Sequence, residues 1–157
     1  MSPDEARREV ERLVRQSEYR REFIVTQTVF LSLAPILYSI AIFTYGDRLW
    51  RVKNTDLAVY RTAMELPNAP ESWGTLFLTL GLGCLLALFT KHDRSLSVIA
   101  AATAVVTSSF MVAFASDYVR FDAPQALPGA IIYGAVGLSF FNLARLAWVS
   151  SRNEAQL

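Results

Sequence analysis

Four blocks of the chain carry no charged side chain, and their lengths set the predicted architecture. The blocks cover residues 23–46, 72–90, 95–116 and 123–144. A bilayer core about 30 Å thick needs roughly 20 apolar residues of helix, because each helical residue advances the chain by about 1.5 Å. Every block reaches about that length, so the pattern predicts an all-α integral membrane protein whose four transmembrane helices form an antiparallel bundle. We place the spans at about 23–45, 72–90, 96–115 and 127–149.

The residues before the first block, 1–22, predict an amphipathic helical arm. Ser2 and Glu5 fit a capping box, and Pro3 fits the first helical position. Helical spacing relates the residues of one face: Ala6, Val10, Leu13, Val14 and Ser17. The arm also carries six Arg and six acidic residues, so it is locally neutral and matches a polybasic lipid anchor poorly. We interpret it as a solvated or self-associating cytosolic helix that continues into the first span, with a helix lying on the membrane as the alternative.

The longest charged segment, 47–71, contains a second amphipathic pattern. Three of its residues share one helical face: Leu57, Tyr60 and Met64. Trp50 and Trp73 flank this pattern, and indole side chains prefer the headgroup layer of a bilayer. We therefore expect an interfacial helix at about 55–66, with an irregular solvated loop as the alternative.

The remaining connections are short. Residues 91–95 alone join the second and third spans, so these spans must form an antiparallel hairpin. A loop is expected at 116–125, where Asp117, Arg120 and Asp122 cluster as the solvated end of a helix. The tail, 150–157, is too short to fold alone.

Composition agrees with this membrane architecture. The chain of 157 residues is 53% hydrophobic and 18% charged, and its mean hydropathy is +0.30. The 15 basic and 14 acidic side chains leave a net charge of +1, which gives no basis for nucleic-acid binding.

The distribution of Lys and Arg predicts the orientation. On one side of the predicted spans lie ten basic residues: Arg7, Arg8, Arg12, Arg15, Arg20, Arg21, Lys91, Arg94, Arg145 and Arg152. On the other side lie five: Arg48, Arg51, Lys53, Arg61 and Arg120. Since basic residues are retained in the cytoplasm, we expect a multi-pass protein of the plasma (inner) membrane with cytoplasmic N- and C-termini.

The spans lack the residues that membrane chemistry usually needs. No Asp, Glu, Lys or His lies in the middle of a span, which argues against a proton-coupled transporter or a small exporter built around an embedded Glu. The single histidine, His92, falls in the hairpin loop, and the single cysteine, Cys84, falls inside a span. We therefore expect no catalytic, cofactor or metal site, and no enzymatic activity.

Small residues form seams along three of the spans. We predict helix packing at Gly81, Gly83, Ala101, Ala104, Ser108, Ala130, Gly134 and Gly137. Small side chains let helix backbones approach closely in lipid, and packing inside one bundle is preferred to subunit association, although both can hold at once. Two polar residues of the fourth span stand out: Asn142 is expected to bond to another helix, and Arg145 to snorkel to the interface.

A resemblance covers about half of the chain. The residues Pro70, Glu71, Ser72, Trp73 and Gly74 open a Gly- and Leu-rich span, a short basic hairpin and an Ala-rich span follow, and Pro128 and Gly129 open the last span. In these features residues 69–148 resemble small four-span membrane proteins of actinobacterial phages and their hosts. The resemblance implies a holin-like protein that oligomerises and permeabilises the membrane. The chain departs from the usual holin pattern because its charged helix is N-terminal and its C-terminal tail is not strongly basic.

Two functional hypotheses follow. The first is a holin-like protein without enzymatic activity, whose partners are the lipid bilayer and further copies of itself. The alternative is an accessory or superinfection-exclusion factor that binds another membrane protein through its N-terminal arm or its external helix.

Overall fold

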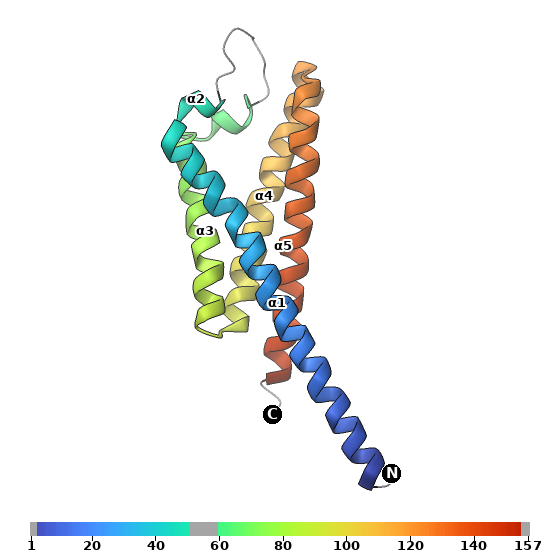
Figure 1. The fold of residues 1–157 in the computed structure, drawn as a ribbon. Helices are drawn as coiled ribbons and strands as arrows, with labels where there is room; N and C mark the ends of the chain where they lie inside the picture. The colour runs from blue at the N-terminus through green and yellow to red at the C-terminus, as the bar shows by residue number, and fades with distance from the viewer. Residues whose placement is uncertain (1–2, 51–59, 155–157) are drawn as a thin grey trace.

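The structure, a computed structural model, describes residues 3–50 and 60–154, and all of its regular elements are helical (Figure 1). In chain order they are α1 (Pro3–Tyr45), α2 (Asp47–Trp50), the 3-10 turn η1 (Ala63–Glu65), α3 (Glu71–Phe89), α4 (Asp93–Phe121), the 3-10 turn η2 (Pro124–Ala126) and α5 (Leu127–Glu154). No strand occurs in the described ranges. The predicted all-α fold is confirmed.

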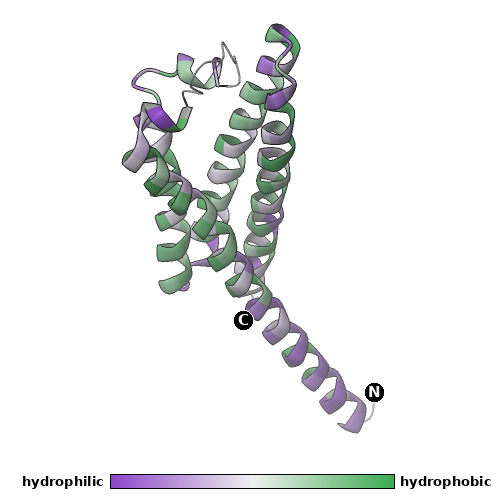
Figure 2. Ribbon diagram, turned by 45° about the horizontal axis from the view of Figure 1, so that its top comes forward, coloured by the Kyte–Doolittle hydropathy of each residue, from purple (hydrophilic) through white to green (hydrophobic). Residues whose placement is uncertain are grey.

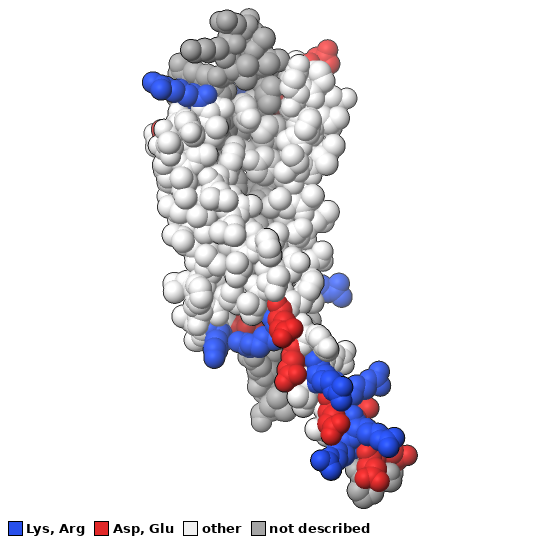
Figure 3. Space-filling model, in the orientation of Figure 1, with Lys and Arg blue, Asp and Glu red and all other residues white. Residues whose placement is uncertain are grey.

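Four of the helices are long and apolar enough to cross a membrane. The qualifying segments are Asp4–Tyr45, Glu71–Phe89, Asp93–Phe121 and Pro124–Arg152. Hydrophobic residues dominate these helices in Figure 2, whereas Figure 3 shows the charged atoms gathered at the two ends of the bundle and along the arm. This distribution is compatible with a multi-pass membrane protein, as the four uncharged blocks predict.

The long helices associate as two closely packed pairs. α1 packs along α3, and α4 packs along α5, while α3 and α4 join the pairs through their hairpin. α1 and α5 touch less extensively. We name the two ends of the bundle the loop end, where α2, η1 and η2 lie, and the arm end, where α1 projects beyond the bundle near the C-terminus (Figure 1).

Each helix pair contains an interhelical hydrogen bond from a serine. Ser39 Oγ of α1 donates to the carbonyl oxygen of Gly74 in α3 at 2.8 Å, and Ser97 Oγ of α4 donates to that of Ala144 in α5 at 2.8 Å. Both serines are buried. A hydroxyl group in apolar surroundings needs a partner, so these bonds fix how the two helices of each pair face one another.

The hairpin between α3 and α4 closes through a Schellman motif at the end of α3. The backbone N–H of His92 bonds to the Ala87 carbonyl at 3.1 Å, and that of Lys91 bonds to the Leu88 carbonyl at 3.1 Å. Lys91 takes the left-handed position of the motif, with φ of 56°. The chain therefore reverses within Thr90 to His92, as the short charged connection predicts.

The first helix agrees with the prediction, and the last helix is longer than predicted. α1 runs from Pro3 to Tyr45 without a break, so the arm and the first span form one helix, as expected. α5 continues to Glu154 and includes residues that we assigned to the tail.

The predicted loop at 116–125 is largely wrong, because α4 continues to Phe121. Asp117 lies on the buried face of this extension, one and two turns beyond Phe114 and Phe110, and its exposed fraction is 0%. The helical face that buries the two phenylalanines therefore also buries the carboxylate. Only a short connection through η2 then separates α4 from α5.

The predicted interfacial helix at about 55–66 is described only in its second half, since residues 55–59 lie outside the described residues. From 60 to 66 the chain forms turns and the short η1 rather than a regular α-helix. Trp73 does not face outward toward headgroups; it is buried, and its Nε1 donates to the carbonyl oxygen of Ala63 at 2.7 Å.

Candidate functional site

One candidate site is a groove of about 770 Å³ on the outer surface of the bundle, between α4 and α5. Its lining is almost wholly apolar and combines a floor of small residues with a rim of larger ones: Ala101, Ala104, Val105, Ser108, Ser109, Val112, Gly137, Leu138 and Phe141. The rim residues Val105, Leu138 and Phe141 are exposed. The groove is therefore open along the side of the bundle that would face lipid.

Gly137 of α5 lies close against α4 at this groove. A Cβ atom at Gly137 would lie 2.9 Å from Ser108 Oγ and 3.2 Å from Thr107 Oγ1. These distances are too short for an ordinary contact with a Cβ atom. The absence of a side chain at Gly137 thus lets the two helices meet and leaves a shallow floor on their outer side.

Half of the predicted packing residues therefore line the groove, namely Ala101, Ala104, Ser108 and Gly137. The others lie between helices of the same bundle. A Cβ atom at Gly81 would lie 2.7 Å from Ile36 Cγ1 of α1, one at Gly83 would lie 3.3 Å from Ile99 Cγ2 of α4, and one at Gly134 would lie 2.9 Å from Met111 Sδ of α4. Ala130 is buried in the core.

The two polar residues of the fourth span lie on the surface of α5. Asn142 lines a small pocket of about 130 Å³ at the junction with α1, whose other residues are Phe23, Gln27, Ser139, Leu143 and Leu146. Its side chain is exposed, as is that of Arg145 one turn further along. The Asn142 and Gln27 amides thus place polar atoms between α1 and α5, which contact each other less extensively than the helices within each closely packed pair.

The loop end of the bundle is filled by aromatic rings around Phe110. The ring centroid of Phe110 lies 4.7 Å from those of Trp73 and Tyr133, 5.3 Å from Phe114 and 5.5 Å from Phe77. Beside this cluster, a cavity of about 200 Å³ is lined by Ala34, Pro35, Tyr38, Phe77, Thr107, Ile132, Tyr133 and Val136. The cavity is smaller than most small-molecule sites, which measure roughly 300–1,000 Å³.

A buried carboxylate of α4 accepts hydrogen bonds from the loop that precedes α3. Asp117 Oδ1 accepts two hydrogen bonds from Thr62, one from the backbone N–H at 3.0 Å and one from Oγ1 at 2.6 Å. The second oxygen, Oδ2, is also buried and has no hydrogen-bond partner among the described residues. The sequence signal for this burial is the spacing of Asp117 three and seven residues after Phe114 and Phe110.

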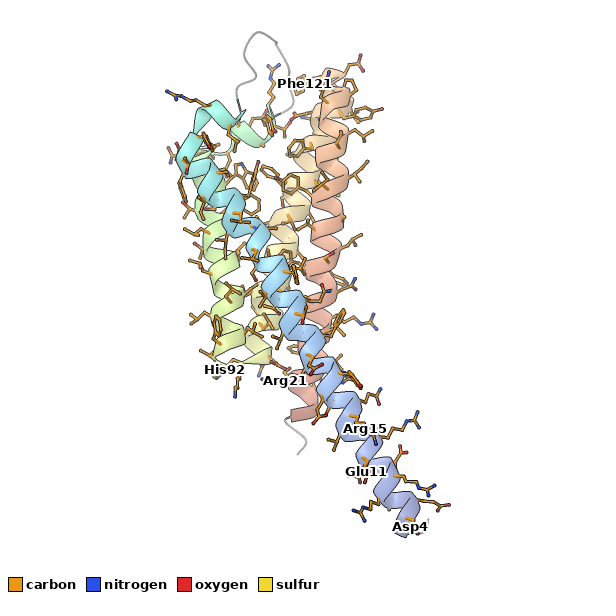
Figure 4. The ribbon with its side chains drawn as sticks, in the orientation of Figure 1. Asp4, Glu11, Arg15, Arg21, His92 and Phe121 are labelled. Atoms are coloured by element: carbon orange, nitrogen blue, oxygen red, sulfur yellow. The ribbon has the colours of Figure 1, made fainter. Side chains whose placement is uncertain are left out.

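The residues on either side of Thr62 are anchored as well. The Arg61 guanidinium lies 4.6 Å from the ring centroid of Phe121, the last residue of α4, which Figure 4 labels at the loop end. The Ala63 carbonyl accepts the hydrogen bond from Trp73. Partial burial raises the pKa of the neighbouring Tyr60. Residues 61–63, which we call the latch, thus connect α3 and α4 across the loop end.

The remaining candidate residues form no reactive group. His92 is exposed at the arm end (Figure 4), where its Nδ1 lies 2.7 Å from the Thr90 carbonyl oxygen. Cys84 is fully buried between helices, and its Sγ lies 4.0 Å from Thr103 Oγ1. Within residues 3–50 and 60–154, no three His, Cys, Asp or Glu side chains come together in a way that could hold a metal ion.

No protein-family model, curated protein or solved structure matches this chain. Its function must therefore be inferred from the groove, the latch and the arm themselves.

Proposed function

We propose that this protein is a polytopic membrane protein without enzymatic activity, which self-associates in the bilayer and permeabilises it as holin-like proteins do. The observation that carries the proposal is the outward-facing groove between α4 and α5. The resemblance of residues 69–148 to small phage-related membrane proteins supports it.

The composition of the groove suits the docking of another transmembrane helix. Lipid chains are as apolar as leucine, so helices in a bilayer associate through close van der Waals packing rather than through the hydrophobic effect. The small floor residues Ala101 and Gly137 allow such an approach, and Val105 and Leu138 provide rims against which a second helix can pack. A second copy of the chain would supply the helix, and repetition of the contact would build an oligomer.

The proposed orientation places both termini in the cytoplasm, by the ten to five distribution of basic residues. The arrangement of the chain supports this proposal. The N-terminal arm, the α3–α4 hairpin and the C-terminus all lie at one end of the bundle (Figure 1). The latch and the aromatic cluster would then lie at the external face of the membrane.

The experiment compares the membrane potential of a bacterial host after induction of the unmodified protein and of two matched variants. Ala101 and Ala102 are neighbouring exposed residues of α4, but only Ala101 lines the groove. We expect Ala101→Leu to fill the groove and to delay or abolish the collapse of the potential, whereas Ala102→Leu leaves it unchanged. A steady potential with the unmodified protein present in the membrane would overturn the proposal.

A second candidate function is an accessory or superinfection-exclusion factor that docks on another membrane protein. The apolar lining of the groove also suits this function, because a helix of another membrane protein can dock there in place of a second copy. For this function we expect a defined membrane protein to co-purify with the unmodified chain and with Ala102→Leu, but not with Ala101→Leu, while the membrane potential stays constant.

A further inference from the structure

The arm of α1, residues 3–22, projects beyond the bundle (Figure 1), and its apolar side chains are uncovered. Val10, Leu13 and Val14 are 59%, 55% and 49% exposed. Figure 4 shows the labelled side chains of Asp4, Glu11 and Arg15 along this projecting part. The arm therefore presents both charged and apolar side chains, and only the latter lack an obvious reason to be there.

One face of the arm carries an apolar stripe, which consists of Ala6, Val10, Leu13, Val14 and Ser17. This stripe continues the packing face of the same helix. Eighteen residues make five turns of an α-helix, so positions eighteen residues apart share one direction. Four residues of the stripe have a counterpart eighteen positions later that is buried in the bundle. The pairs are Ala6 and Ile24, Val10 and Thr28, Val14 and Ser32, and Ser17 and Pro35. The same step from Arg12 leads to Phe30, which is 72% exposed.

The arm thus carries the face of a helix that packs on other helices, with no described helix along it. We propose that this face binds the arm of a second copy of the chain, side by side and parallel. The inference rests on one part of the proposed function, namely that the chain spans a membrane, because copies in one membrane present their arms on the same side and in the same direction. It requires neither permeabilisation nor the groove.

The charges of the arm fit a second copy better than an anionic bilayer surface. The six Arg and six acidic residues of residues 1–22 cancel, so anionic lipid attracts the arm little. We place Val10 and Ser17 at central positions of the heptad in a parallel pair of arms. At the positions that flank this contact, Glu9 of one copy then faces Val14 of the other, and Gln16 of one copy faces Arg21 of the other. At these flanking positions, therefore, no two side chains of like charge face each other.

The contact is short, and this sets the conditions under which it forms. Arg20 occupies the next central position after Ser17, so the two arms must separate there, and the contact covers only residues 6–17. About three turns of helix do not form a stable pair in dilute solution. Attachment to the same membrane raises the effective concentration of the arms, so the pairing belongs to the membrane-bound protein.

Disulfide cross-linking of the full chain in native membrane vesicles tests the pairing. Cys84 stays in place, since it is fully buried, and the unmodified chain serves as the blank. Single cysteines are introduced on the stripe, with Ala6→Cys and Ser17→Cys, and on the charged face, with Arg8→Cys and Arg12→Cys. We expect the stripe variants to form covalent dimers several times faster than the charged-face variants.

Gel electrophoresis of the cross-linked samples also shows the relative direction of the two arms and the identity of the partner. A parallel pair cross-links copies of Ala6→Cys to each other, whereas an antiparallel pair cross-links Ala6→Cys only to Ser17→Cys in a mixed sample and would overturn the proposal. Equal rates on both faces, or adducts to a protein of another mass, would also overturn it. Repeating the measurement with Ala101→Leu separates the two interfaces, because we expect the arm dimers to persist when the groove is filled.

Discussion

At the scale of single residues, Asp117 has the clearest structural role. One of its oxygens accepts both hydrogen bonds from Thr62, although a fully buried carboxylate is costly unless its charge is compensated. The carboxylate thereby accepts a hydrogen bond from a backbone N–H that is partly shielded from water. The latch depends on this one side chain for its polar contact with α4.

We expect Asp117→Ala to destabilise the latch by about 2 kcal/mol, because it leaves the Thr62 N–H and hydroxyl without their acceptor. Hydrogen exchange of the amides at 60–66 would then be faster in the variant than in the unmodified chain. Asp117→Asn is the matched control, since its amide oxygen can still accept both bonds. Equal exchange rates in Asp117→Ala and the unmodified chain would show that the latch does not need the carboxylate.

Lys91 is the second residue with a clear structural role, and its backbone conformation lowers the stability of the fold. Its φ of 56° is unfavourable for a side chain with a Cβ atom, by roughly 1–2 kcal/mol. We expect Lys91→Gly to raise the thermal midpoint of the detergent-solubilised protein, while Lys91→Ala, which removes the charge but keeps the Cβ atom, does not. A lower midpoint for Lys91→Gly would argue against the Schellman geometry of the hairpin.

At the scale of helices, the pattern of charges predicted the spans well and their ends less well. A block without charges identifies a span because an ionised side chain in lipid is costly, whatever the helix packs against. The pattern does not predict the end of α4, because an Asp such as Asp117 in a linear sequence indicates solvent. Its carboxylate is in fact buried against Thr62, a contact between residues far apart in the chain that a linear pattern does not show.

The two glycines of α3 provide a prediction about helix packing. A Cβ atom at Gly81 would lie 3.1 Å from the backbone oxygen of Ser32, which cannot move aside easily, whereas at Gly83 it would meet only the Ile99 side chain. We expect Gly81→Ala to lower the free energy of unfolding by roughly 1–3 kcal/mol through overpacking. Gly83→Ala should be neutral or stabilising, since alanine favours a helix over glycine by about 1 kcal/mol. Unfolding in mixed detergent measures both, and the reverse order would contradict the α1–α3 packing.

At the scale of the whole molecule, the two ends of the bundle are packed differently. Aromatic rings and the latch fill the loop end, whereas the core toward the arm end combines several alanines with larger side chains such as Leu96, Phe140 and Leu143. Two of the surfaces that this packing leaves uncovered are the groove between α4 and α5 and the stripe on the arm. Both are suited to helices, and we assign both to contacts between copies of the chain.

The candidate site could be predicted from the sequence only in part. Glycine and alanine at helical spacing indicate a packing surface, but the rotation of each helix decides whether that surface faces its own bundle or the lipid. Gly134 and Gly137 are one turn apart in the same seam, and both face α4 within the helix pair, yet only Gly137 lines the open groove.

Self-association through the groove is the central claim, and energy transfer between labelled copies in lipid vesicles tests it most directly. The chain is labelled with donor or acceptor at Arg152→Cys, an exposed position, while the fully buried Cys84 is left unlabelled. We expect transfer well above the level of random encounters at the same protein density for the unmodified groove and for Ala102→Leu, and a marked decrease for Ala101→Leu. Transfer at the random level with the unmodified groove, or equal transfer in the two leucine variants, would contradict the claim.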